Sequence, residues 1–70
     1  MPRKEPLLGY FAGEGQGNRI RVAVYKAGRT YRLSYLAQTH LCHPSITSLA
    51  LCKREASHVF MVDIEEFQPL

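Results

Sequence analysis

The sequence predicts an α+β fold, in which a three- or four-stranded, mainly antiparallel sheet carries one helix on one face, in the order β-β-β-α-β. Three observations lead to this fold. The chain has 70 residues, of which 46% are hydrophobic and 21% charged, as expected of a single small globular domain. Apolar and polar residues alternate in residues 19–35 with the period of two that is typical of strands. The residues after Pro44 instead keep helical spacing.

Residues 1–6 (MPRKEP) predict a flexible basic arm, because two prolines flank the charged residues and favour extended backbone. A single domain is expected over residues 7–68. It begins with a short strand, since residues 7–12 (LLGYFA) are mostly apolar and aromatic. In residues 13–18 (GEGQGN) the glycines alternate and lead into a strand rather than a helix. This run therefore predicts a flexible hairpin connection and not a nucleotide-phosphate loop.

A hairpin with a two-residue loop at Ala27 and Gly28 is expected in the centre of the chain, because glycine tolerates the positive φ of such a loop. This register places Val24 opposite Tyr31. One face of the hairpin is then apolar. The other face is basic, and its expected side chains are Arg19, Arg21, Ala23, Tyr25, Thr30, Arg32, Ser34 and Leu36.

A helix is expected from about Ser45 to Ala56, with Pro44 and Ser45 as first-turn or capping residues. The next apolar run, Val59 to Val62, predicts an interior strand. An acidic segment follows, and we expect it to neutralise part of the basic face if it lies beside the hairpin. The sheet and the helix are expected to share a core made of Val22, Val24, Tyr31, Leu33, Leu49, Phe60 and Val62.

The charge is distributed unevenly along the chain, whose formal net charge is +3. Residues 1–35 hold seven Lys and Arg against two Glu, whereas residues 36–70 hold two basic and four acidic residues. Such asymmetry is typical of proteins that orient on a charged partner, although a solvated surface also carries scattered charge. No apolar run approaches the roughly 18 residues of a membrane span, and the start lacks a secretory signal. A cytoplasmic protein that does not contact the membrane is expected.

Five potential zinc ligands occur in the second half of the chain: His40, Cys42, His43, Cys52 and His58. Their spacing contains no C-x-x-C pair, so structural roles are favoured over a metal site, and no cofactor is expected. A Cys42–Cys52 disulfide is not expected, because a helix between the two would separate them by far more than the ~6 Å that a bridge tolerates. Nothing marks a third group that would orient a Cys–His pair for catalysis, so no enzyme activity is expected.

The basic hairpin face is the strongest functional signal in the sequence. The planar fork of arginine donates two parallel hydrogen bonds to phosphate, and a tyrosine ring can stack on a base. Lys26 and Arg29 are expected at the hairpin tip. The expected binding residues are Arg19, Arg21, Tyr25, Lys26, Arg29 and Arg32. The alternation in residues 19–32 resembles the arm-binding sheets of phage integrases, although the strand expected after the helix departs from that pattern.

We therefore expect a small non-enzymatic module that binds nucleic acid or a nucleoprotein complex. The alternative is a protein-binding inhibitor or adaptor from a phage or mobile element, similar to anti-CRISPR proteins, that would meet an acidic protein surface on a host defence complex. Small size alone motivates that analogy. Chains of this size also gain stability by pairing with a copy of themselves, so a homodimer is a further open alternative.

Overall fold

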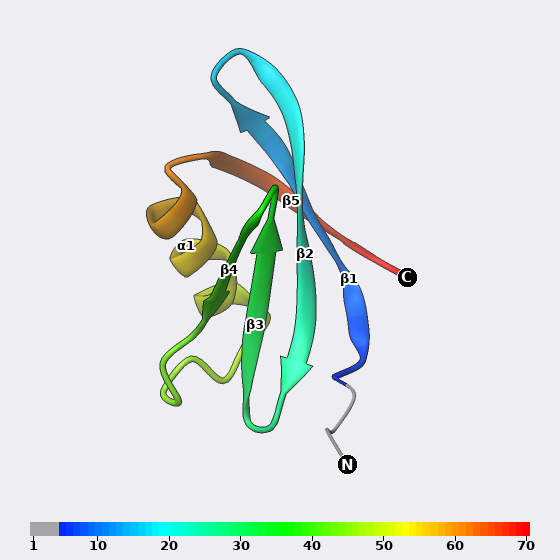
Figure 1. Ribbon diagram of the computed structural model, residues 1–70, viewed down its shortest axis with the longest axis vertical. Coiled ribbons are helices and arrows are strands. Elements are labelled where there is room, and N and C mark those ends of the chain that lie inside the picture. The colour runs from blue at the N-terminus through cyan, green and yellow to red at the C-terminus, as the bar shows by residue number, and fades with distance from the viewer. Residues whose placement is uncertain (1–4) are drawn as a thin grey trace.

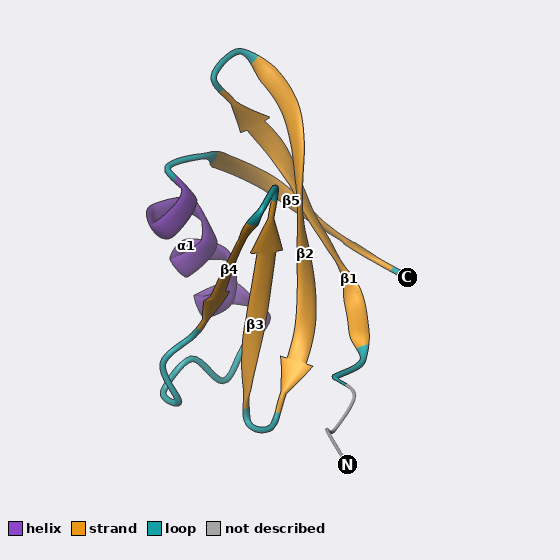
Figure 2. Cartoon of the chain, in the orientation of Figure 1, coloured by secondary structure: helices purple, strands orange, loops and turns teal. Residues whose placement is uncertain are grey.

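The computed structural model describes residues 5–70, which form one antiparallel sheet of five strands with a single helix. The elements follow one another in the order β-β-β-β-α-β. Their bounds are β1 Leu7–Gly15, β2 Asn18–Ala27, β3 Thr30–Tyr35, β4 Gln38–Leu41, α1 Leu49–Phe60 and β5 Asp63–Pro69. In the sheet the strands are ordered β4-β3-β2-β1-β5, so that β4 and β5 form its two edges. The helix lies on one side of this sheet, and no helix lies on the other (Figures 1 and 2).

The expected α+β class is confirmed, but the expected three or four strands are too few. The strand that the sequence analysis missed is β4, which pairs with β3 and places Tyr35 opposite Gln38. It has only four residues and no apolar alternation. The turn before it is Leu36–Ala37, and Leu36 takes a φ of 55°. A leucine in the left-handed region is uncommon, so no ordinary turn signal announces this hairpin.

The β2–β3 hairpin forms as expected, but the turn lies one residue later than predicted. The two-residue loop is Gly28 and Arg29, between the paired Ala27 and Thr30. Gly28 takes a φ of 64°, which the missing Cβ allows at no steric cost. Ala27 and Thr30 therefore flank the turn, where Lys26 and Arg29 were expected to flank it. Because both strands shift together, the other paired residues of the two strands stay on their predicted faces of the sheet, and only Thr30 beside the turn departs from its predicted place.

The glycine-rich run belongs largely to the strands of the β1–β2 hairpin, and only Gln16 and Gly17 form its turn. The tip of this hairpin projects beyond the neighbouring strands (Figure 1). Gly13 lies where β5 bends against β1, next to a register shift between Ala12 and Gly13. A Cβ at Gly13 would overlap the backbone carbonyl of Asp63. The glycine is therefore required for the close approach of β5.

The helix runs from Leu49 to Phe60, so the expected span from Ser45 to Ala56 is wrong at both ends. Pro44 and Ser45 belong to a turn in which the Ile46 N–H donates to the carbonyl of His43. Ser48 is the N-cap, and its hydroxyl accepts a hydrogen bond from the Leu51 N–H. Several serines and threonines precede the helix, and only tertiary contacts select the capping one.

The expected interior strand from Val59 to Val62 is also wrong. Val59 and Phe60 complete the helix, and Met61 ends it in the left-handed conformation with a φ of 55°. The last strand begins only at Asp63 and lies at the edge of the sheet. β-branched and aromatic residues favour strands in isolation, but packing of the helix on the sheet overrides that preference here.

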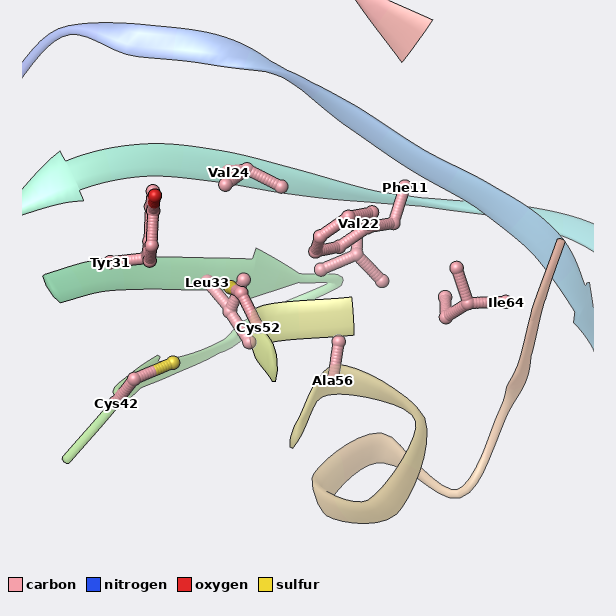
Figure 3. Packing of buried hydrophobic residues seen from close by; sticks show 9 residues of the cluster. All are labelled: Phe11, Val22, Val24, Tyr31, Leu33, Cys42, Cys52, Ala56 and Ile64. Atoms are coloured by element: carbon pink, nitrogen blue, oxygen red, sulfur yellow. The ribbon is translucent and has the colours of Figure 1, made fainter. Parts of the chain in front are cut away.

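The core lies between the sheet and the helix, where Cys52 and Ala56 of α1 face the strands (Figure 3). Its buried members are Phe11, Val22, Val24, Tyr31, Leu33, Cys42, Cys52, Ala56 and Ile64. Leu49, Phe60 and Val62 pack against this cluster and are partly buried. The predicted core is therefore confirmed, although it omits Phe11, Ala56, Ile64 and the two cysteines.

Residues 1–4 of the predicted basic arm lie outside the described residues. Glu5 and Pro6, the last two residues of the predicted arm, contact the sheet. The backbone N–H of Lys26 donates to the carbonyl of Pro6, and Glu5 pairs with Arg32. No helix within residues 5–70 is long and apolar enough to cross a membrane.

Candidate functional site

The two faces of the sheet differ in what covers them. Side chains on one face pack against α1, whereas the opposite face carries no helix (Figure 1). Cross-strand partners share a face, so the strand register identifies the side chains of the uncovered side. We call this side the open face, and it comprises Tyr10, Ala12, Glu14, Arg19, Arg21, Ala23, Tyr25, Arg32, Ser34, Thr39, Leu41, Glu66 and Gln68.

The centre of the open face is an arginine stacked on an aromatic ring. The guanidinium carbon of Arg21 lies 4.2 Å from the ring centroid of Tyr10, which is a cation–π contact. Arg21 is exposed and has no carboxylate partner within residues 5–70. The stack holds the side chain in place and leaves its charge available to an anion.

A shallow hollow of about 230 Å³ lies beside this stack. Its lining consists of Ala12, Arg19, Ile20, Arg21 and Gln68. Two guanidinium groups and a primary amide therefore border one concavity, and all of these groups donate hydrogen bonds, although the Gln68 amide already donates to Glu66 Oε2 at 2.9 Å. Such a donor set suits the oxygen atoms of a phosphate or carboxylate.

The other two arginines of the open face are already paired with carboxylates. Arg19 Nη1 lies 2.9 Å from Glu65 Oε1, and Arg32 Nε lies 2.8 Å from Glu5 Oε1. Hydrogen bonding to these glutamates raises the pKa of Arg19 and of Arg32. The expectation that the acidic C-terminal segment neutralises part of the basic face is thus confirmed at Arg19. Both pairs are solvent-accessible, where ion pairs are weak and exchangeable.

The six predicted binding residues do not lie together. Arg19, Arg21, Tyr25 and Arg32 share the open face, and Tyr25 lies directly opposite Arg32. Lys26 faces the helix side instead, with its Nζ 4.7 Å from the ring centroid of Tyr31. Arg29 is exposed in the two-residue turn, so its expected place at the hairpin tip is confirmed. The expectation that Lys26 lies at the tip is wrong, because the turn lies one residue later and Lys26 is paired with Tyr31 within the strands.

Thr30 is a second correction to the predicted basic face. It is only 7% exposed, and its hydroxyl lies within hydrogen-bond distance of the carbonyls of His43 and Ile46. The hydroxyl therefore fixes the loop between β4 and α1. It is not available to a ligand on the open face.

Two of the three histidines and both cysteines have structural partners, whereas His58 is exposed on the helix. His40 Nε2 lies 2.9 Å from Glu55 Oε2, which links β4 to the helix, and His43 is bonded to Ser45. No group of three or more histidine, cysteine or acidic side chains within residues 5–70 is arranged to hold a metal ion.

The expected separation of the two cysteines is wrong. Cys42 and Cys52 are free, buried thiols of the same core cluster, and each is close enough to influence the pKa of the other. The loop after β4 folds back before the helix begins at Leu49, so little helix lies between them. Burial raises the pKa of both thiols, which keeps them protonated and unreactive at neutral pH.

Sequence reasoning missed several residues of the site, including Tyr10 and Gln68 on the open face and Glu5, the partner of Arg32. Tyr10 alternates with the buried Phe11 in the first strand, so the period of two could have placed it on the face of Arg21. Glu5 carried no local signal, and Glu65 was expected only as a member of the acidic segment, without its partner Arg19. They are 27 and 46 residues from the arginines that they contact.

Comparisons of the chain with family models, with curated proteins and with solved structures return no match.

Proposed function

We propose that the protein is a non-enzymatic binding module whose open face engages nucleic acid, with single strands preferred. The observation that carries this proposal is the Arg21–Tyr10 stack beside the hollow over Ala12, on a face that no helix covers. Residues in direct ligand contact would be Arg19, Arg21, Tyr25 and Arg32 on this face.

The chemistry of the open face matches the two components of a nucleotide chain. Arg19 and Arg21 border a concavity in which phosphate oxygens would accept their hydrogen bonds. Tyr25 is a half-buried aromatic ring on the same face, and an unpaired base can stack on it or on the Arg21 guanidinium that covers Tyr10. Phosphate contacts of this kind are independent of sequence, so we expect little base specificity.

The width of the sheet favours a single strand over a duplex. Five strands at a spacing of about 4.8 Å span roughly 19 Å, whereas the major groove is about 12 Å wide. The open face as a whole therefore does not fit into the groove. An extended single strand can instead cross several β-strands and expose its bases to the aromatic side chains.

The carboxylate pairs of Arg19 and Arg32 set the expected strength of binding. A phosphate must displace Glu65 or Glu5 to reach these guanidinium groups fully. The exchange costs little because both pairs are accessible to water. We therefore expect weak binding that is sensitive to salt, carried mainly by Arg21.

The same pairs favour a second candidate, an inhibitor or adaptor that binds an acidic protein surface. Glu5 and Glu65 already occupy positions that carboxylates of a partner protein could take over. On this alternative the open face would bind an acidic protein and have little affinity for nucleic acid.

Two variants that each lack one positive charge, on opposite sides of the molecule, test the proposal. Arg21→Ala alters the open face, whereas Arg54→Ala removes the same charge from the exposed side of the helix. We expect Arg21→Ala to weaken binding to a fluorescent single-stranded oligonucleotide about tenfold or more, and Arg54→Ala to change it little. Fluorescence anisotropy measures both affinities at one salt concentration. Equal losses in the two variants would indicate attraction by net charge alone and would refute a site on the open face.

A further inference from the structure

The two edges of the sheet differ in their protection against pairing with another strand. The β5 edge carries the acidic residues Asp63, Glu65 and Glu66, ends at Pro69 and pairs with β1 through a register shift. Charges, proline, bulges and very short edge strands are features with which proteins prevent strand addition at an edge. The β5 edge is therefore guarded.

The β4 edge has only one of these features, its length of four residues. Its four residues, Gln38–Leu41, contain no proline and no acidic or basic side chain other than His40, which is paired with Glu55. Its register with β3 is regular. Two leucines flank this edge in an exposed position, Leu36 at 84% and Leu41 at 52% exposure. An unguarded edge bordered by apolar side chains is typical of a pairing site.

The hydrogen-bond pattern identifies which backbone groups are free to pair. The Cys42 N–H donates to the carbonyl of Tyr31, which marks this residue pair as hydrogen-bonded. Hydrogen-bonded pairs alternate along an antiparallel ladder, so His40 and Gln38 also direct their backbone groups toward β3. The N–H and C=O groups of Thr39 and Leu41 consequently point away from the sheet.

We propose that a second copy of this chain pairs with this edge, β4 against β4, in antiparallel orientation. Self-pairing of β4 brings no like charges together, whereas self-pairing of β5 would oppose carboxylates. A two-fold axis through the β4 pair closes the assembly, since the same groups are used on both copies. Pairing of β4 with the β5 edge of another copy would instead use the guarded edge. It would also leave one β4 edge and one β5 edge unpaired, to which further chains could add.

The geometry of this pairing keeps the two open faces on the same side. Groups at Thr39 and Leu41 can bond only to the equivalent groups of the second copy, because these alone point outward. The alternation of side chains is then continuous across the junction. The dimer thus presents one surface with two copies of the Arg21–Tyr10 stack. This inference concerns oligomeric state and does not depend on what the open face binds.

Sedimentation equilibrium of the full chain over concentrations from about 10 µM to about 1 mM tests the proposal, since weak pairing is populated only at high concentration. We expect the mass to rise from the 8.0 kDa of one chain toward twice that value and to stop there. NMR spectra over the same range should show concentration-dependent shifts of the Thr39 and Leu41 amides, with those of the β5 strand unchanged. A chain that stays monomeric throughout, or one that forms larger polymers, overturns the proposal.

Thr39→Pro removes an outward N–H without touching the β3–β4 ladder, because proline is tolerated where an edge N–H faces solvent. Thr39→Val is the matched control and keeps the N–H. We expect the proline variant to weaken dimerisation about tenfold or more and the valine variant to leave it nearly unchanged. Leu41→Lys, which adds a charge to the edge of each copy, should also favour the monomer. This variant replaces Thr39→Pro in the test if the proline variant does not fold. A dimer equally stable in Thr39→Pro or Leu41→Lys would place the contact elsewhere.

Discussion

At the scale of single residues, Thr30 shows how one hydroxyl can hold a loop in place. Its Oγ1 lies 3.0 Å from the carbonyl of His43 and 2.8 Å from that of Ile46. Thr30→Val keeps the shape of the side chain but removes the donor from a buried position. We expect the variant to lose about 1–2 kcal/mol of the free energy of unfolding, measured by urea denaturation. Thr30→Ser retains the hydroxyl and should lose less, and equal losses would show that the hydroxyl is not what stabilises the loop.

The buried thiol of Cys52 makes stability depend on pH in the alkaline range. Burial raises its pKa in the folded protein, whereas an unfolded chain has the ordinary thiol pKa of about 8.5. The stabilisation is therefore complete below about pH 8.5 and is lost as pH rises above it, because the unfolded state ionises first. Urea denaturation under reducing conditions should give a lower free energy of unfolding at pH 10 than at pH 7. Cys52→Ala should have a smaller difference between the two pH values, and an unchanged difference would exclude Cys52 as its source.

At the scale of elements, the start of the helix depends on Ser48. Its hydroxyl accepts a hydrogen bond from the Leu51 N–H, one of the backbone donors that a helix leaves unpaired at its start. We expect Ser48→Ala to lower the free energy of unfolding by about 1 kcal/mol. The neighbouring Thr47 is exposed, and its hydroxyl makes no hydrogen bond within the described residues. Thermal denaturation of Thr47→Ala should differ little from that of the wild type. A larger loss in this control would place the cap elsewhere.

Local patterns identify the elements of this fold unequally well. The β2–β3 hairpin is predictable because the alternation in residues 19–35 is strong and Gly28 marks the turn. The β4 strand is not predictable, because its four residues are too few to show a period of two and the turn before it contains a leucine in place of a typical turn residue. The helix boundaries fail because Val59 and Phe60 favour strands locally, while packing against the sheet keeps them helical.

The candidate site is predictable only in part for a similar reason. The period of two places Arg19, Arg21, Tyr25 and Arg32 on one face from the sequence alone. Their partners are set by contacts between distant parts of the chain, such as Arg19 with Glu65 and Arg32 with Glu5. A count of arginines therefore overstates the charge that the face presents, since two of the three on it are already matched.

At the scale of the whole molecule, positive and negative residues meet on the open face and do not remain at opposite ends of the chain. The first 35 residues are net basic and the last 35 are net acidic. β5 pairs with β1, which brings acidic side chains to the same sheet as the arginines. The open face is thus a patterned surface with one unmatched arginine at its centre, and its affinity for anions should depend on geometry more than on net charge.

The salt dependence of single-stranded oligonucleotide binding tests this account most directly, with the wild type compared with the triple variant Arg19→Ala, Arg21→Ala and Arg32→Ala. The variant should remain folded, because these side chains face away from the core and exposed ion pairs contribute little. For the wild type we expect a slope of log K against log salt between about −0.7, if Arg21 alone neutralises a phosphate, and about −2, if Arg19 and Arg32 also exchange their glutamates for phosphates, with loss of measurable binding in the variant. Binding of the variant as tight and as salt-dependent as that of the wild type would contradict a nucleic-acid site on the open face.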